Sequence, residues 1–215
     1  MFSGIIEKLA QVHEFEVSND KSYIALAIDN SDLLLKIGDS VAVNGVCLTI
    51  AKIENHLFYY DLSPETLSLT SLKDLSVNDS VNIEYPLTLN KFISGHITTG
   101  HVDSIGIIKS LQKIIDSWEV VVEVKSDILK YIIHKGSITI DGVSLTVNKL
   151  DNNLIDLMII PHTFENTIFK NYKIGQKVNI EVDYITKHLE KLKNDYHNPR
   201  NNKFYKKRQD CYHYG

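Results

Sequence analysis

The stretch Val-Asn-Gly-Val-Cys-Leu-Thr-Ile at residues 43–50 returns at residues 140–147 as Ile-Asp-Gly-Val-Ser-Leu-Thr-Val. The two copies lie 97 positions apart, and other matches keep this offset: Pro64 with Pro161, and VNIE at residues 81–84 with VNIE at residues 178–181. One register held over so much of the chain indicates that a single domain has been duplicated. Two copies are too few for a solenoid, so we expect two similar domains in tandem.

Each copy of this motif predicts a tight hairpin turn followed by a strand. The dipeptides Asn44-Gly45 and Asp141-Gly142 tolerate the positive φ angles of a two-residue turn. In the strand that follows, alternate residues are apolar and should build a core, while the opposite face has small polar side chains. These small residues are Cys47 and Thr49 in the first copy and Ser144 and Thr146 in the second. In a single strand they would be ordinary outward-facing residues, but their recurrence in both copies favours a binding surface.

The remaining pattern is dominated by short strands. We expect further strands at residues 23–28, 57–62, 80–85, 118–124, 154–159 and 177–183, and short helical turns after Pro64, Ser126 and Pro161. Short strands at regular spacing predict an all-β-dominated fold of two tandem six-stranded antiparallel β-barrels. A C-terminal helix should begin near Ile185, where Leu189 and Leu192 continue an apolar stripe that packs either on its own chain or on a partner. The predicted domains are residues 1–97 and 98–184 for the barrels, 185–196 for the helix and 197–215 for a basic polar tail.

Composition and charge narrow the possible classes of protein. Of the 215 residues, 43% are hydrophobic and 23% charged, and no apolar run approaches the roughly 18 residues of a membrane helix. The N-terminus lacks the pattern of a signal peptide, so we expect a cytoplasmic protein and no membrane partner. Two cysteines, Cys47 and Cys211, support neither a disulfide framework nor a zinc site and are interpreted as free thiols.

The C-terminal tail raises the question of nucleic-acid binding. From Lys193 onward there are six basic and two acidic residues, with Phe and Tyr among them and no Leu, Ile or Val. A segment that cannot bury apolar area is expected to be disordered. An oligonucleotide-binding barrel remains an alternative, but the acidic body and the lack of a basic or aromatic stripe along the barrels argue against nucleic acid.

A few side chains could do chemistry. His96 and His101 are five residues apart, which does not aim both at one metal, and no Cys or carboxylate cluster completes a metal site. His101 and Asp103 are two apart in what should be the first strand of the second barrel, where the carboxylate could orient the imidazole; a structural histidine is the alternative. Asp183 stands where the first copy has Pro86 and serves either a functional site or the N-terminus of the last helix. The usual nucleotide-binding and hydrolase motifs are absent.

In combination, five motifs resemble the riboflavin synthase α-chain family: MFSGII, VNGVCLTI, SGHITTGHVD, IDGVSLTVN and VNIEVD before a final helix. The resemblance covers residues 1 to about 192, with Ser3 where the family usually has Thr. It implies a homotrimer held by the C-terminal helices, two lumazine-binding barrels per chain, and lumazine synthase as a further partner. The implied reaction transfers a four-carbon unit between two 6,7-dimethyl-8-ribityllumazine molecules, giving riboflavin and 5-amino-6-(ribitylamino)uracil, without cofactor or metal. Two like substrates would need two like pockets, which is a reason for the repeated motif.

The resemblance also implies the site residues. For the N-terminal pocket they are Gly4, Ile5, Ile6, Cys47, Leu48, Thr49, Asp61, Leu62, Ser63, Pro64, Glu65 and Thr66. For the C-terminal pocket they are Gly100, His101, Val102, Lys135, Ser144, Leu145, Thr146, Met158, Ile159, Ile160, Pro161, His162 and Thr163. Implied in catalysis are Phe2, Ser40, Cys47, His101, Ser144, Thr146 and Asp183.

For the mechanism we hypothesise that His101 assists deprotonation of the C7 methyl group. Ser144, Thr146 or a water molecule would add transiently to C7, and Cys47 would position the ring. The lumazine proteins of luminous bacteria look similar and hold one chromophore as an antenna without turnover, which leaves a non-catalytic binding protein as the alternative. All positions implied in catalysis are present here, which favours the enzyme.

Overall fold

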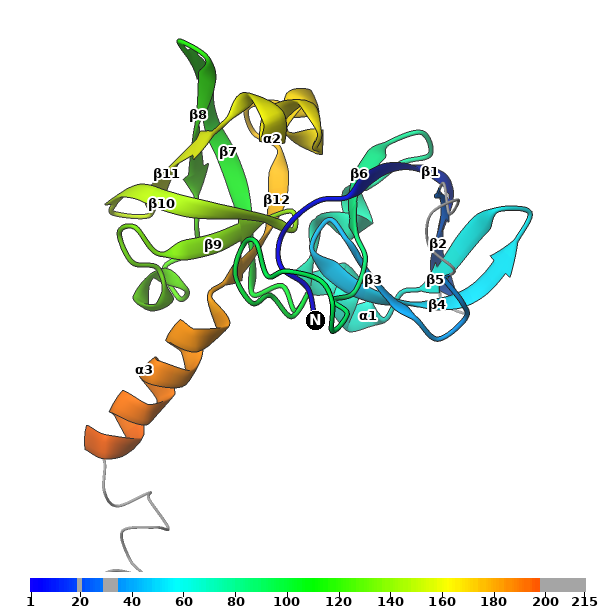
Figure 1. The fold of residues 1–215 in the computed structure, drawn as a ribbon, viewed down its shortest axis with the longest axis horizontal. Coiled ribbons are helices and arrows are strands. Elements are labelled where there is room, and N and C mark those ends of the chain that lie inside the picture. The colour runs from blue at the N-terminus through cyan, green and yellow to red at the C-terminus, as the bar shows by residue number, and fades with distance from the viewer. Residues whose placement is uncertain (19–20, 29–34, 198–215) are drawn as a thin grey trace, which may run out of the picture.

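The computed structural model describes residues 1–18, 21–28 and 35–197. The chain forms two closed antiparallel barrels and a C-terminal helix (Figure 1). The first barrel has the strand order β1-β2-β5-β4-β3-β6. Its strands are β1 (Lys8–Val17), β2 (Ser22–Ala27), β3 (Ser40–Val43), β4 (Val46–Glu54), β5 (Leu57–Asp61) and β6 (Ser80–Glu84).

The second barrel repeats this plan in the order β10-β11-β8-β7-β12-β9. Its strands are β7 (Ser104–Ile114), β8 (Ser117–Glu123), β9 (Ser137–Ile140), β10 (Val143–Asp151), β11 (Leu154–Ile159) and β12 (Lys177–Val182). The helical elements are α1 (Pro64–Leu69), η1 (Ser71–Asp74), η2 (Leu129–Tyr131), α2 (Pro161–Glu165), η3 (Ile168–Asn171) and α3 (Tyr184–His197). The predicted fold class is therefore confirmed, and the expected strands lie within one residue of the observed ones.

One strand prediction is wrong. The first strand of the second barrel begins at Ser104, so His101 and Asp103 precede it and do not share a strand face. The Asp103 carboxylate is used elsewhere: Oδ2 accepts a hydrogen bond from the Val182 amide at 2.9 Å, and Oδ1 forms an ion pair with Lys187 at 2.7 Å. Asp103 thus ties β12 and α3 to the entry of the second barrel.

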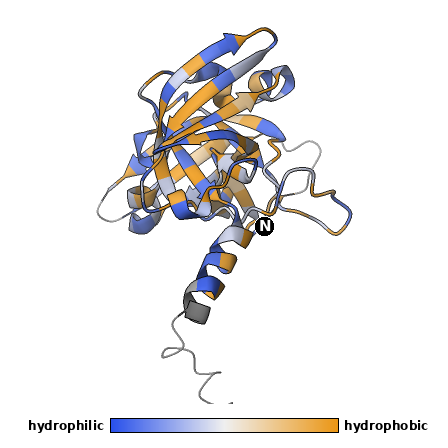
Figure 2. Cartoon of the chain, turned by 90° about the vertical axis from the view of Figure 1, so that its left-hand side faces the viewer, coloured by the Kyte–Doolittle hydropathy of each residue, from blue (hydrophilic) through white to orange (hydrophobic). Residues whose placement is uncertain are grey.

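Strand alternation places a separate core inside each barrel. In β4 Val46, Leu48 and Ile50 are buried while Thr49 is exposed, and in β10 Val143 and Val147 are buried while Thr146 is exposed. Figure 2 shows hydrophobic and hydrophilic residues alternating along the strands. The small polar residues of the repeated motif therefore face out of the barrels, as predicted.

The two predicted hairpin turns are confirmed, and they meet where the barrels join. Asn44 and Gly45 have φ of 45° and 74°, and Asp141 and Gly142 have 44° and 81°, as a type I′ turn requires. The turns pack so closely that a Cβ on Gly45 would lie 2.5 Å from the Gly142 nitrogen. Each turn pairs its carbonyl with an asparagine of the opposite barrel: Asn82 Nδ2 donates to the Asp141 carbonyl at 2.9 Å, and Asn179 Nδ2 to the Asn44 carbonyl at 2.8 Å. The duplicated halves are thereby related by an approximate twofold axis.

The C-terminal helix α3 extends away from both barrels (Figures 1 and 2). Asp183 caps it, with Oδ1 accepting from the Ile185 amide at 2.9 Å, which is the helix-capping alternative of the two considered for this residue. The apolar stripe of Ile185, Leu189 and Leu192 is 56%, 60% and 64% exposed. The described part of the chain therefore leaves most of this stripe uncovered. Within the described part of the chain, no helix is long and apolar enough to cross a membrane.

Candidate functional site

Two extended segments run side by side between the barrels, the N-terminal residues 2–6 and the linker residues 95–102 (Figure 1). Phe2 and Thr98 exchange backbone hydrogen bonds of 2.9 and 3.1 Å, and the His96 amide donates to the Ser3 carbonyl at 3.1 Å. The Phe2 side chain is buried, with 1% of its surface exposed. These backbone bonds hold the two segments together as a short irregular ribbon.

Two buried glutamates at the ends of equivalent strands fix the ribbon. Glu84 of β6 accepts from the Ser3 amide at 2.7 Å, the Ser3 hydroxyl at 2.9 Å and the Gly4 amide at 2.9 Å. Glu181 of β12 accepts from the Thr99 amide at 2.8 Å, the Thr99 hydroxyl at 2.7 Å and the Gly100 amide at 3.0 Å. Burial raises the pKa of Glu84, and the hydrogen bonds from Ser3 and Gly4 oppose that rise.

These glutamates are not among the predicted site residues, although the sequence contains a signal for them. Both close the VNIE repeat, which the sequence analysis uses only as a sign of duplication. A carboxylate repeated at the end of a buried strand needs hydrogen-bond donors, and backbone amides of a passing segment provide them.

The ribbon crosses between the barrels, which corrects the predicted grouping of the pocket residues. The Ser144 amide donates to the Gly4 carbonyl at 2.7 Å, whereas the Cys47 amide donates to the Gly100 carbonyl at 2.9 Å. Ile6 packs against the core of the second barrel and Val102 against the core of the first. The prediction that residues 4–6 lie with Cys47 and residues 100–102 with Ser144 is wrong, because each segment serves the other barrel.

Two surfaces result, related by the approximate twofold axis. The first-barrel surface consists of residues 47–49, the end of β5 with residues 61–66, and the linker residues 100–102. The second-barrel surface consists of residues 144–146, the end of β11 with residues 158–163, and the N-terminal residues 4–6. In the first barrel β4 pairs with β5 so that the start of β4 lies beside the end of β5, and Ile50 is opposite Tyr60. In the second barrel β10 pairs with β11 in the same way, and Val147 is opposite Leu157.

Most predicted residues of the first-barrel surface are accessible. Cys47 is half-buried and free, and Thr49, Asp61, Ser63, Pro64, Glu65 and His101 are exposed, whereas Leu48 and Leu62 are buried. Ser63 caps α1, with Oγ accepting from the Thr66 amide at 3.0 Å. Ser40 is half-buried and lies opposite Thr49 in the β3–β4 pair. Cys211 lies outside the described residues.

The second-barrel surface is similar but more apolar. Ser144, Leu145, Ile6 and Thr163 are half-buried, Ile5, Thr146, Met158, Ile160, Pro161 and His162 are exposed, and Ile159 is buried. Behind α2, Phe164 stacks on Trp118 with ring centroids 3.8 Å apart. Lys135, exposed and with φ of 64°, donates from Nζ to Asn148 Oδ1 at 3.0 Å. The two surfaces offer accessible small polar groups beside apolar side chains, which suits a planar heterocycle.

His96, which the sequence pattern brings forward only as a possible metal ligand, also belongs to this region. Its Nδ1 lies 2.8 Å from Ser144 Oγ, on the second-barrel surface. Burial lowers the pKa of His96, and the charge of Asp183 partly opposes this. Burial thus favours the neutral form of the imidazole.

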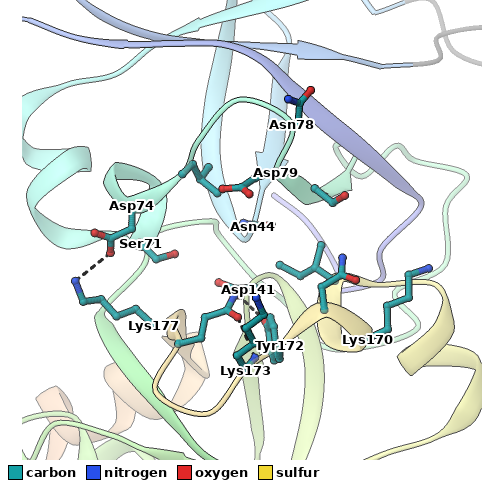
Figure 3. Close-up of a pocket in the computed structure, with 15 residues that line it drawn as sticks. Asn44, Ser71, Asp74, Asn78, Asp79, Asp141, Lys170, Tyr172, Lys173 and Lys177 are labelled. Atoms are coloured by element: carbon teal, nitrogen blue, oxygen red, sulfur yellow. Dashed lines mark hydrogen bonds and ion pairs between the residues drawn. The ribbon is translucent and has the colours of Figure 1, made fainter.

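A cavity of about 880 Å³ lies elsewhere. It opens between the barrels beside the hairpin turns, and Figure 3 shows Asn44 and Asp141 near the middle of its lining, with the Asp74–Lys177 ion pair at one side. None of the predicted site residues lines it. Its lining includes Asn44, Ser71, Asp141 and Ile168, whose backbone groups already form hydrogen bonds that join the barrels. We therefore place the candidate site on the two strand surfaces.

Comparisons with known proteins agree with this geometry. The family model of the lumazine binding domain matches twice, at residues 3–86 and 99–183. The riboflavin synthase of Photobacterium phosphoreum is 40% identical over 196 residues, covering 89% of this chain and 88% of that protein. The riboflavin synthase of Bacillus subtilis (strain 168) is 39% identical over 193 residues, covering 88% of each.

A solved structure of LumP complexed with 6,7-dimethyl-8-(1'-D-ribityl) lumazine has the same fold. It superposes with a TM-score of 0.77 at 21% identity, covering 85% of this chain and 99% of that one. A structure of LumP complexed with riboflavin gives 0.79 at the same identity and coverage. Since the family model covers both barrels and the sequence relatives span nearly the whole chain, the protein belongs to the riboflavin synthase family of enzymes, built from two lumazine-binding domains.

Proposed function

We propose that this chain catalyses the dismutation of two 6,7-dimethyl-8-ribityllumazine molecules to riboflavin and 5-amino-6-(ribitylamino)uracil. The observation that carries the proposal is the pair of like surfaces: each barrel presents the repeated strand with small polar side chains, crossed by an extended segment fixed by a buried glutamate. Two copies of one substrate suit two copies of one surface. The identity of about 40% to riboflavin synthases over most of the chain supports the same activity.

In this proposal the protein works mainly by orientation. The lumazine ring is an electron sink that acidifies its own methyl group, so holding two rings face to face and moving protons is what remains for the protein. Exposed His101 is proposed to assist deprotonation of the methyl group, and Ser144 or Thr146 to add at C7 of the donor. Cys47, Ser40, Phe2 and Asp183 are assigned to positioning; Asp183 does so by capping α3.

We further propose that the active form is a homotrimer in the cytoplasm. The exposed stripe of Ile185, Leu189 and Leu192 on α3 supports association through this helix. The first-barrel surface of one chain would face the second-barrel surface of its neighbour. An association with lumazine synthase stays a prediction.

The test is direct. Purified protein in EDTA-containing buffer is mixed with 6,7-dimethyl-8-ribityllumazine, and lumazine loss and riboflavin formation are followed by absorbance and fluorescence. One riboflavin for every two lumazines consumed is the expected result. Tight binding of one lumazine per chain with no riboflavin would contradict it and identify a chromophore-holding protein instead.

A further inference from the structure

His96 is a half-buried histidine joined to a side chain of the second-barrel surface. Nδ1 lies 2.8 Å from Ser144 Oγ, and Nε2 is buried without a hydrogen-bond partner among the described residues. The neighbouring Gly95 is packed so tightly on Ser144 that a Cβ there would lie 2.7 Å from the Ser144 Cβ. The close packing of the linker on Ser144 therefore places the His96 imidazole beside the Ser144 hydroxyl.

This contact breaks the twofold relation between the surfaces. The residue equivalent to Ser144 is Cys47, and both halves make the equivalent backbone bonds, from Ser144 to Gly4 and from Cys47 to Gly100. In the part of the chain that the structure describes, however, the Cys47 thiol has no histidine partner. A dismutation uses one ring as donor and the other as acceptor, so two chemically identical pockets would not assign the roles.

The 2.8 Å contact fits either tautomer, and the tautomer relevant to proton uptake is the one in which the imidazole is the acceptor. In a neutral ring one nitrogen carries the proton and the other accepts. With Nδ1 accepting from the Ser144 hydroxyl, the proton resides on the buried Nε2. A hydrogen-bond donor buried without a partner is a cost that proteins retain mainly at functional positions. A contact serving only to fasten the linker would not need a titratable ring.

We propose that His96 is a positioning residue that orients Ser144 and takes up its proton, so that the second-barrel surface becomes the one where the donor lumazine is activated. This inference rests on the proposed function. As a bond forms between Ser144 Oγ and C7 of the ring, the hydroxyl proton passes to His96 Nδ1 and the displaced electron pair moves into the pteridine. When the ring leaves, the Oγ–C7 bond breaks and the proton returns. No oxidant, reductant or further reactant is required.

The test is a double-mutant cycle on the full chain. His96→Asn retains an acceptor near the Nδ1 position but cannot take up a proton, and Ser144→Ala removes the hydroxyl. Loss of one proton-transfer group is expected to lower kcat by about 10²-fold in either variant, with KM and riboflavin affinity changed less than about threefold. Because the two residues act as a unit, the double variant should be no slower than Ser144→Ala alone.

The matched control uses the equivalent position of the other barrel. In Cys47→Ala combined with His96→Asn, the two losses in kcat should multiply, because His96 does not act through Cys47. Circular dichroism and thermal unfolding show whether each variant folds, and His96→Gln replaces His96→Asn if the latter does not.

The outcomes separate the two claims. Absence of riboflavin formation by the wild-type chain overturns the proposed function and this inference with it. A wild-type chain that turns over while His96→Asn keeps its kcat, or raises only KM, overturns the inference alone. Losses that multiply between His96 and Ser144 would also overturn it, since they would show that His96 does not act through Ser144.

Discussion

At the scale of single residues, the two hairpin turns differ in one informative side chain. Asn44 and Asp141 occupy equivalent buried positions, and each accepts from the amide of the equivalent asparagine on its own barrel, Asn82 or Asn179, at 2.7 Å. Asp141 also accepts from the Tyr172 hydroxyl. Burial raises the pKa of Asp141 to about 7, although the hydrogen bonds from Tyr172 and Asn179 act in the opposite direction.

A raised carboxyl pKa in the folded protein has a definite consequence for stability. The unfolded chain releases this proton near pH 4 and the folded chain near pH 7, so the folded state holds more protons in between. The free energy of unfolding should therefore be largest below pH 4 as far as this group is concerned, and fall as the pH rises from about 4 to about 7.

We predict that Asp141→Asn removes this decrease in the free energy of unfolding with rising pH. Asn44 shows that an amide fits the turn, and the variant has no charge to bury. Urea unfolding at pH values from about 4 to 8 should show a wild-type free energy that declines by up to about 1.4 kcal/mol per pH unit more steeply than that of the variant. Glu84, whose pKa is also raised, is present in both proteins and cancels in the comparison. Parallel curves would contradict the assignment.

At the scale of elements, the crossing ribbon depends on close approach of its glycines to the barrel strands. Gly100 has φ of +77°, and a Cβ there would lie 2.6 Å from the Cys47 Cβ and 2.8 Å from the Cys47 nitrogen. Gly38 has φ of +92°, but no described atom lies within 4 Å of the position that a Cβ would take there. Substitutions at Gly38 and Gly100 therefore separate the cost of a left-handed backbone from the cost of a steric clash.

We predict that Gly38→Ala lowers the free energy of unfolding by about 1–2 kcal/mol, the cost of a left-handed alanine. Gly100→Ala should cost about 1–3 kcal/mol more, because the linker must move off β4. Urea midpoints of the two variants measure the difference, and riboflavin affinity should fall only in Gly100→Ala. Equal destabilisation would mean that the linker yields freely and does not shape the first-barrel surface.

How far the sequence predicts the structure differs between elements. The barrels, the turns and the outward face of Cys47 and Ser144 follow from local alternation and the repeat. The pairing of the crossing segments does not, because it depends on which barrel a segment reaches after leaving its own strand. For the same reason His96, which reaches Ser144 only through the linker path, has no local signal. Residues 101–103 have the pattern of a strand but lie outside one; side-chain carboxylates bond on either side of them, Glu181 to the Gly100 amide and Asp103 to the Val182 amide.

At the scale of the whole molecule, α3 is the element through which the proposed trimer would assemble. Ile185, Leu189 and Leu192 are more than half exposed, so the helix gains little stability from packing these side chains on its own barrels. Burying that stripe in a second and third chain would remove apolar area from water and bring surfaces of different chains together.

We predict that Leu189→Lys converts a trimer into monomers and lowers riboflavin formation in parallel. Leu189 is 60% exposed in the single chain, so the change should leave the barrels folded while placing a charge in the proposed interface. Sedimentation measures the assembly and fluorescence the turnover. Because association follows mass action, the activity of the variant per chain should rise with protein concentration, whereas that of the wild type should not.

The control is Ile174→Lys, the same kind of change at a 72% exposed position between η3 and β12, which should affect neither measurement. A wild-type chain that sediments as a monomer at full activity would refute the proposed trimer, and with it the pairing of first- and second-barrel surfaces across chains.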